Sequence, residues 1–269
     1  HFALGLLGSL LDTEFASRYS VSPMDENDVD MGDMSQLRAA ILEIDANQKP
    51  QHIFLLASSI SAMIGADLEG LRFALQDEIH AQLHILDSGG FKGGAKTGTE
   101  YFYEVLAEIV RDNQDLKVLA TPVPKTYQVL GASADHFRLA SDLNELQRLL
   151  KSGLDLQLKG SFSVGGSIKA LQEPASINLV LRAEALPLAK ALEEVYGTPY
   201  LAISPYGYAG CLEMLEQIAS RLGIEVKAPF AKELETKQRQ LRALGRGPRL
   251  RPRRHVLAIA APEHVRCGI

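Results

Sequence analysis

Three serine residues that follow a short apolar run are the residues of this chain best placed for chemistry. Ser58, Ser59 and Ser61 come after the apolar run at residues 53–57 and before a helical pattern that begins at Met63. A strand, a polar turn and a helix in this order form the unit of a parallel α/β sheet, which binds ligands at the carboxyl ends of its strands. The spacing therefore predicts a ligand site at these serines, and the alternative is that Ser59 only caps the helix.

A glycine-rich loop at residues 88–99 lies between a predicted strand and a predicted helix, and it contains Gly89, Gly90 and Phe91. Backbone N–H groups in such a loop can bind an anion near the N-terminus of the helix. The loop matches neither of the common glycine motifs for phosphate binding, so we favour a flexible loop over a cleft.

A further loop, at residues 204–211, joins a predicted strand to a predicted helix and ends at Cys211. A thiolate metal ligand is favoured near a helix N-terminus, but cysteine is also a common core residue. His80 and His84 can share a strand face, although such pairs are more often structural than metal-binding. An acidic cluster near the N-terminus is more often a solvated turn than a cation site. The candidate binding residues of the loop are Ser204, Tyr206 and Gly207, and the acidic cluster is Asp25, Glu26, Asp28, Asp30 and Asp33.

Composition and charge limit the function classes. The 269 residues are 46% hydrophobic and 23% charged with a net charge of −5, so no global basic field favours nucleic acid. No apolar run approaches the roughly 20 residues of a membrane-spanning helix, and the N-terminus, which begins at His1 as if truncated or processed, has no signal-peptide pattern. Two distant cysteines favour a reducing, cytoplasmic location and are too few for the four thiolates of an ordinary iron–sulfur cluster.

Strand and helix patterns alternate along the chain, which predicts an α/β fold of tandem Rossmann-like parallel-sheet domains. We expect an N-terminal segment and first domain at residues 1–125, a second domain at 126–250 and the start of a third at 251–269, because residues 121–125 are rich in proline. The predicted strands are residues 52–57, 81–86, 117–121, 127–131, 154–158, 177–181, 200–203 and 255–261. The predicted helices are residues 36–45, 66–78, 100–112, 142–151, 167–171, 187–196, 209–222 and 230–244.

Six segments, taken in order, resemble motifs of the component 1 family of nitrogenase-like oxidoreductases. That family includes the nitrogenase α and β subunits, cofactor-assembly scaffolds, the dark-operative protochlorophyllide and chlorophyllide reductases, and a nickel-tetrapyrrole reductive cyclase. Glu26, Asp28 and Gly32 resemble an early Glu-x-Asp-x-x-x-Gly segment. Residues 58–67, which include Gly65, resemble a segment like Ser-Glu-Met-Ile-Gly-Asp-Asp. The other matching segments are residues 89–93, 141–150, 175–181 and 199–207, so the resemblance covers nearly the whole chain.

The resemblance implies an iron–sulfur cluster or a tetrapyrrole as cofactor, a related partner subunit, and an ATP-driven iron–sulfur reductase as electron donor. The family's cluster cysteines fall at Ser9 and Ser59 of this chain, and serine does not routinely replace a thiolate ligand. Ala62 and Ala66 replace acidic residues that are usual in the family. The resemblance therefore implies that the cluster is lost here or is held mainly by a partner chain, and that most of a third domain is missing.

We expect a divergent subunit of a nitrogenase-like two-component oxidoreductase that lacks its own cluster cysteines. The alternatives are a non-catalytic scaffold or binding protein for a metallocofactor or tetrapyrrole, and a plain α/β small-molecule binder. We expect a homo- or hetero-oligomer, because the apolar side chains within residues 2–11 need burial, and neither nucleic acid nor a membrane as partner. A ligand should lie where the strand ends at residues 58–61 and 89–91 face Ser204, Tyr206 and Gly207.

Overall fold

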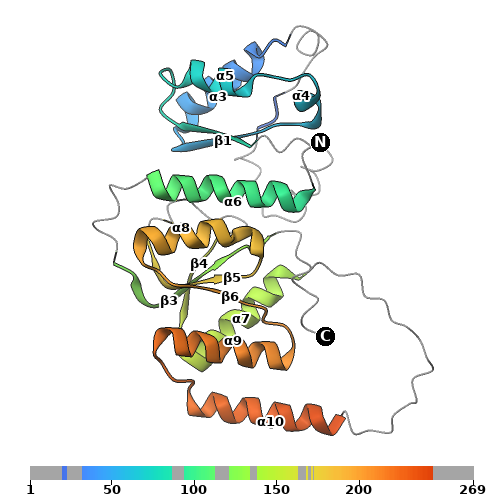
Figure 1. Cartoon of the computed structure of the whole chain (residues 1–269), viewed down its shortest axis with the longest axis vertical. Coiled ribbons are helices and arrows are strands. Elements are labelled where there is room, and N and C mark those ends of the chain that lie inside the picture. Colours follow the sequence, from blue (N-terminus) through green and yellow to red (C-terminus); the bar gives the residue numbers. More distant parts are fainter. Residues whose placement is uncertain are drawn as a thin grey trace, which may run out of the picture. The chain divides into compact units, whose positions relative to one another are not determined.

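The computed structural model describes residues 20–22, 32–86, 94–112, 121–133, 138–162, 168, 171 and 173–244. The chain divides into two compact units, residues 1–108 and 109–269 (Figure 1). The domain boundaries expected at residues 125 and 250 stay predictions. The strands expected at residues 117–121 and 255–261 lie outside the described residues, apart from residue 121, as does most of the short helix expected at residues 167–171.

The first unit is built on two parallel strands. Its elements are α3 (Ser35–Gln48), β1 (His52–Leu56), α4 (Ser59–Met63), α5 (Leu68–Leu75), β2 (Gln82–Leu86) and α6 (Ala95–Asp112), the last of which crosses the unit boundary. β1 pairs with β2 along its whole length, with His52 opposite Gln82 and Leu56 opposite Leu86. The buried apolar cluster of this unit comprises Ile41, Leu71, Leu75 and Leu83.

A buried carboxylate ties α3 to the start of β2. Asp45 accepts backbone N–H bonds from His80, at 3.2 and 3.1 Å, and from Ala81, at 2.9 Å, and its Oδ2 lies 3.2 Å from the Nδ1 atom of His80. These backbone donors hold the pKa of Asp45 below its ordinary value. β2 begins after this contact, at Gln82. The expectation that His80 and His84 share a strand face was therefore wrong, because His80 precedes the strand.

The second unit contains a four-stranded parallel sheet in the order β4-β3-β5-β6 (Figure 1). Its elements are β3 (Val123–Leu130), α7 (Leu139–Leu154), β4 (Gln157–Phe162), β5 (Ala175–Val180), the 3₁₀ turn η4 (Ala183–Ala185), α8 (Leu186–Tyr196), β6 (Tyr200–Ala202), α9 (Gly207–Leu222) and α10 (Ala228–Leu244). In Figure 1, α8 lies on one side of the sheet, and α7, α9 and α10 lie on the other. Helices on both faces bury both faces of the strands, as parallel sheets require.

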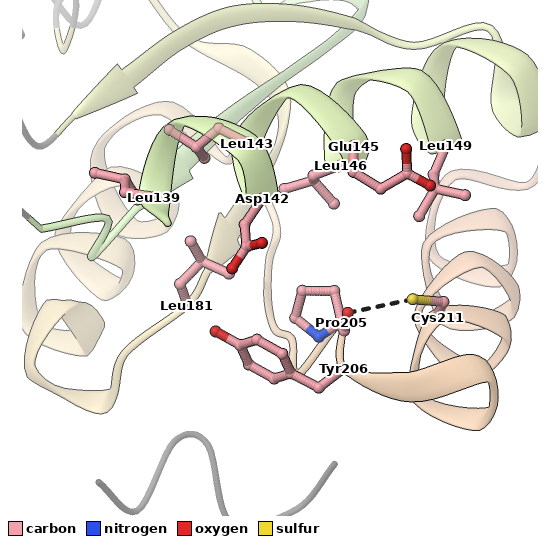
Figure 2. A pocket seen from close by; sticks show the side chains of 10 residues that line it. All are labelled: Leu139, Asp142, Leu143, Glu145, Leu146, Leu149, Leu181, Pro205, Tyr206 and Cys211. Atoms are coloured by element: carbon pink, nitrogen blue, oxygen red, sulfur yellow. Dashed lines mark hydrogen bonds between the residues drawn. The ribbon is translucent and has the colours of Figure 1, made fainter. Parts of the chain in front are cut away.

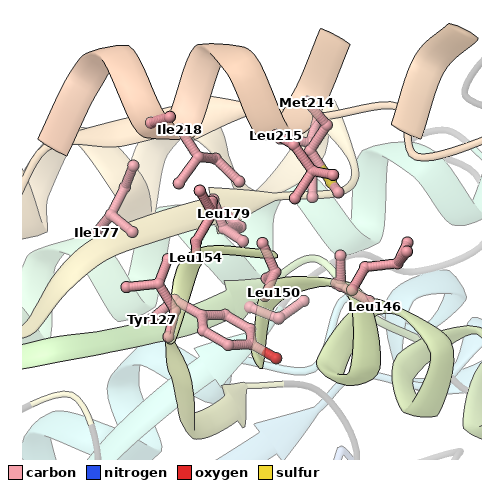
Figure 3. Close-up of a cluster of buried hydrophobic side chains, with 14 of the residues drawn as sticks. Tyr127, Leu146, Leu150, Leu154, Ile177, Leu179, Met214, Leu215 and Ile218 are labelled. Atoms are coloured by element: carbon pink, nitrogen blue, oxygen red, sulfur yellow. The ribbon is translucent and has the colours of Figure 1, made fainter. Parts of the chain in front are cut away.

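The core of the second unit follows the two-residue alternation of its strands. Tyr127, Ile177 and Leu179 point toward leucines of α7 and apolar residues of α9 (Figure 3). Burial raises the pKa of the Tyr127 phenol to about 12. Phe230 and Leu234 add the inner face of α10 to the same cluster.

The α/β class and the parallel sheets are confirmed. The helix expected at residues 66–78 is shorter in the structure, where α5 begins at Leu68 and ends at Leu75. A separate five-residue helix, α4, precedes it. Among the described residues, no helix is long and apolar enough to cross a membrane.

Candidate functional site

The serines at the carboxyl end of β1 form the start of α4. The Ser58 side chain accepts a hydrogen bond from the backbone N–H of Ser61 at 3.0 Å, and the Ser61 hydroxyl donates to the Ser58 carbonyl at 2.9 Å. Ser58 is therefore the N-cap, and the alternative that Ser59 caps the helix was wrong. Ser59 is the first residue of α4, and its exposed hydroxyl makes no hydrogen bond to any described residue.

Gly65 turns the chain out of α4 and toward α5. Its φ of +66° lies in the left-handed region, which favours glycine. The N–H of Ala66 bonds to the carbonyl of Ser61 at 3.0 Å, and the N–H of Gly65 bonds to that of Ala62 at 3.4 Å. This pair of bonds is the Schellman motif, in which a glycine directly after the helix satisfies its last carbonyls.

The surface around α4 is apolar and exposed. No residue of α4 is buried, and Leu56, Ile60 and Met63 are 65%, 55% and 72% exposed. We call these three residues the α4 patch. Large apolar side chains gathered on a surface commonly mark an interaction site. The β1–α4 end therefore presents the Ser59 hydroxyl beside a surface suited to contact with another molecule.

The loop after β6 holds the candidate residues of the second unit. The backbone N–H of Tyr206 donates to the Ser204 carbonyl at 2.8 Å, and Gly207 starts α9 with a φ of +68°. α9 thus begins two residues earlier than the sequence predicts. A β-carbon on Gly210 would lie 2.6 Å from the Ser204 carbonyl oxygen, so glycine there allows the helix to approach the loop closely.

A pocket that is partly open to solvent lies between this loop and α7 (Figure 2). Most of its wall is apolar, and the polar groups on it are the carboxylates of Asp142 and Glu145, the Tyr206 hydroxyl and the Cys211 thiol. The lining residues are Leu139, Asp142, Leu143, Glu145, Leu146, Leu149, Leu181, Pro205, Tyr206 and Cys211. Pockets that combine an apolar wall with a few polar groups are typical small-molecule sites.

Burial and neighbouring carboxylates keep the Cys211 thiol and the Tyr206 phenol protonated. Burial and the Glu145 carboxylate raise the pKa of the Cys211 thiol, whose S–H donates to the Pro205 carbonyl at 3.2 Å. Burial and the Asp142 carboxylate raise the pKa of Tyr206, against an opposing effect of Arg182. Cys211 is therefore a neutral thiol rather than the thiolate that metal binding requires. Among the described residues, no group of three or more His, Cys, Asp or Glu side chains could hold a metal ion.

The predicted site residues fall into three groups. Ser58, Ser59, Ser61 and Gly65 lie together at the end of β1 in the first unit. Tyr206 and Cys211 line the pocket of the second unit, and Ser204 and Gly207 flank it along the chain. Ser9, Gly89, Gly90 and Phe91 lie outside the described residues.

Neither pocket carboxylate was among the residues predicted from the sequence. Asp142 and Glu145 lie three residues apart on α7, which places them on neighbouring turns of one helix face. Their three-residue spacing among the leucines of α7 was the only feature of the sequence that could have placed both carboxylates on one side of the helix. Glu145 is also paired with Arg148, through two contacts of 2.8 Å that lower the pKa of Glu145.

Comparison with known proteins gives a consistent result. Residues 6–263 match the family described as Nitrogenase component 1 type Oxidoreductase. The chain is 31% identical over 232 residues to the nitrogenase iron-molybdenum cofactor biosynthesis protein NifE of Clostridium pasteurianum, covering 84% of this chain and 48% of that protein. It is 26% identical over 217 residues to one of the subunits of light-independent protochlorophyllide reductase from Nostoc punctiforme, covering 77% of this chain and 42% of that protein.

Solved structures agree on the fold. A chain of nitrogenase Cp1 at pH 6.5 superposes with a TM-score of 0.60 at 21% identity, covering 82% of this chain and 42% of that chain. This likeness confirms the expected nitrogenase component 1-like fold. The chain spans slightly less than half the length of the curated relatives it matches.

Proposed function

Because the chain belongs to the nitrogenase component 1 type oxidoreductase family, we propose that it is a subunit of a nitrogenase-like two-component oxidoreductase and supplies no cluster thiolate of its own. Relatives in this family are named as one subunit of a reductase or as the alpha chain of a nitrogenase protein, so they work as parts of multi-subunit proteins. In our proposal the partners are a related subunit and an ATP-driven iron–sulfur reductase, and the location is the cytoplasm.

The α4 patch is the single observation that carries this proposal. Leu56, Ile60 and Met63 lie within four residues, along the chain, of the position at which the family resemblance places a cluster cysteine and this chain has Ser59. A second chain that covers the patch would bury its apolar area, a favourable change of roughly 25 cal/mol for each Å². It would also bring any thiolate ligands of its own to this end of β1.

The residues of this chain do not fit an iron–sulfur cluster held by the chain alone. Ser59 offers a hydroxyl where the family has a thiolate, and Cys211 is a neutral thiol already bonded to the Pro205 carbonyl. Serine and protonated cysteine are poor ligands for the iron of such clusters. We therefore derive no electron-transfer step through a cluster in this chain.

A charged substitution in the α4 patch tests whether this surface pairs with a second chain. Met63→Glu should weaken self-association, or association with a co-purified related subunit, by at least about tenfold, because a paired interface would bury an unpartnered carboxylate. Val123→Glu is the matched control, since Val123 is also apolar and exposed but lies on β3. Light scattering over a concentration series measures both. A wild-type chain that stays monomeric throughout, with or without the related subunit, would contradict the proposal.

Iron and sulfide analysis tests whether this chain alone can hold an iron–sulfur cluster. The chain purified anaerobically by itself should contain neither element in stoichiometric amount, because it lacks the ligands. Stoichiometric iron and sulfide in the isolated chain would refute this part of the proposal.

We also propose that the ligand or partner contacts of this subunit include Ser58, Ser59, Ser61 and Gly65 of the first unit and Ser204, Tyr206 and Gly207 of the second. Ser59→Leu should weaken binding of the related subunit while leaving the melting temperature nearly unchanged, because Ser59 is exposed and does not cap α4. Ser58→Ala is the matched control: it removes the cap and should lower stability by about 1 kcal/mol. Equal affinity for wild type and Ser59→Leu would remove Ser59 from the site.

A second candidate function is a non-catalytic scaffold or binding protein for a metallocofactor or tetrapyrrole. The similarity to a protein named for cofactor biosynthesis favours it, as does serine at the expected cluster positions. Absorbance of the anaerobically purified protein separates the two functions. A bound tetrapyrrole or metallocofactor that no reductase turns over would support the scaffold.

A further inference from the structure

Two histidine rings meet on one face of the β1–β2 sheet. His52 Nδ1 lies 3.0 Å from His84 Nε2, and the ring centroids are 5.2 Å apart. His84 stands opposite Phe54 in the strand register, and Phe54 is two residues after His52 on β1. Because side chains two residues apart share a face of a strand, all three rings project from the same side of the sheet.

Aromatic side chains pack beside this pair. Phe54 stacks on His84 with a 24° angle between the rings and centroids 5.0 Å apart, and Phe102 of α6 meets Phe54 edge-on at 5.8 Å. Burial lowers the pKa of His52 below its ordinary value of 6.5, so its ring is neutral at neutral pH and keeps a lone pair. Both rings are half-buried, which leaves a path from solvent.

We propose that His52 and His84 form a two-histidine site for a divalent transition-metal ion, with water completing the coordination shell. Neutral imidazole nitrogen is a common ligand for such ions. The described residues add no third histidine, cysteine or carboxylate ligand at this place. The proton that the two rings share moves through solvent to the other nitrogen of its own ring, so that both facing nitrogens offer lone pairs, and each ring tilts until its lone pair points at the ion.

The spacing of the two nitrogens selects the geometry. With metal–nitrogen bonds of about 2.0–2.1 Å, two ligands at a right angle lie about 2.9 Å apart, and two tetrahedral ligands lie about 3.4 Å apart. The 3.0 Å of the metal-free pair is closer to the right-angle value, so square-planar or octahedral coordination requires the smaller movement of the rings. Cu²⁺ prefers tetragonal geometry and binds nitrogen ligands more tightly than Ni²⁺ or Zn²⁺. Cu²⁺ should therefore bind this site most tightly.

A purely structural role for the pair makes a different prediction. A hydrogen bond between the rings would join β1 to β2 and contribute about 1 kcal/mol to stability. It would give the protein no metal affinity beyond that of its other histidines. Metal binding and stability must therefore be measured separately.

The experiment is a Cu²⁺ titration of the full chain without a histidine tag, followed by electron paramagnetic resonance. All samples carry His1→Ala, so that an N-terminal histidine does not compete for the ion. We expect one bound Cu²⁺ with splitting from two nitrogen ligands, and affinity at least about tenfold weaker in His52→Gln and in His84→Gln, because losing a ligand costs at least as much as losing an outer-shell partner. His80→Gln is the matched control, since His80 lies in the same unit and contacts Asp45 instead.

Three results would overturn the proposal: no two-nitrogen Cu²⁺ signal, equal affinity in all variants, or Zn²⁺ binding as tightly as Cu²⁺. Metal-free circular dichroism checks that each variant is folded. If glutamine prevents folding at position 84, His84→Thr replaces it, because threonine suits a strand. A lower melting temperature in the variants with unchanged Cu²⁺ affinity would assign the pair to structure alone.

Discussion

In the second unit Ile177, Leu179 and Val180 of β5 are almost completely buried, whereas no residue of β1 in the first unit is. The second unit covers both faces of its four strands with its own helices. The first unit ends β1 at Leu56, which is 65% exposed, and follows it with a helix that buries none of its residues. The second unit therefore buries its strands with its own helices, whereas the first unit leaves apolar side chains exposed that another molecule can cover.

The two units also differ in how they treat buried polar groups. Asp45 in the first unit meets three donors from His80 and Ala81. Asn178 in the second unit is 1% exposed, and neither its amide oxygen nor its amide nitrogen has a hydrogen-bond partner among the described residues; the same holds for the Thr198 hydroxyl. An unpartnered buried polar group typically costs about 1–3 kcal/mol. The better-packed unit therefore carries the larger polar penalty.

Truncating one core leucine in each unit should give the largest contrast. Leu179→Ala should lower the free energy of unfolding by about 2–5 kcal/mol, because Leu179 is fully buried. Leu55→Ala should cost less, because Leu55 on β1 is only partly buried. Urea unfolding of both variants measures the difference. Equal losses would show that the first unit is packed as tightly as the second.

Glycines with positive φ sharpen the comparison. Gly131→Ala places a β-carbon 3.0 Å from the Arg182 backbone nitrogen, at a φ of +82°. Gly65→Ala meets nothing within 4 Å at a φ of +66°, so it should cost only the left-handed strain of about 1–2 kcal/mol. Gly131→Ala should cost more, because the contact adds to the strain. Thermal unfolding of both variants measures the two losses of stability. A smaller loss for Gly131→Ala than for Gly65→Ala would mean that the backbone near Arg182 shifts at little energetic cost.

Changing one buried polar residue in each unit should have opposite effects. Asn178→Val should raise stability by about 1 kcal/mol, because it removes two unpartnered polar atoms from β5. Asp45→Asn should lower stability, because one amide oxygen replaces two carboxylate oxygens that accept backbone N–H groups. Chemical unfolding measures both changes. Destabilisation by Asn178→Val would indicate that ordered water satisfies the amide.

Acidification should weaken the first unit slightly. Burial lowers the folded pKa of His52 below 6.5, so between the two values the unfolded chain binds more protons than the folded one. The contribution of His52 is therefore present above about pH 6.5 and is lost as the pH falls toward the folded pKa. Hydrogen exchange of β1 amides at neutral pH and near pH 5 measures the loss. His52→Gln should flatten the pH dependence, and an unchanged slope would exclude His52 as its cause.

The sequence allowed prediction of those features that depend on local residue patterns, which are the strands and the longer helices. Apolar runs and helical periodicity located the described strands and the described α-helices except α4, because burial on a sheet imposes those patterns. β3 begins four residues before the expected residue 127. β4 shares only residues 157 and 158 with the strand expected at 154–158, because α7 extends to Leu154. α4 was missed because a five-residue helix with no buried residue carries no periodic signal. Ser58 rather than Ser59 as the cap depends on one residue of helix register, which sequence patterns do not fix. The Asp45 anchor, the His52–His84 contact and the pocket carboxylates depend on tertiary packing that brings distant segments together.

The strand order of the second sheet has a consequence for how the chain is made. β3 leaves the ribosome first, β4 then adds to one edge, β5 adds to the other edge, and β6 adds beside β5. No described strand has to enter between two strands that are already paired. Each new strand pairs with one that has already been made, so pairing can follow the order of synthesis. We expect this sheet to assemble strand by strand during synthesis, with α7 covering it after β3 and α8 after β5.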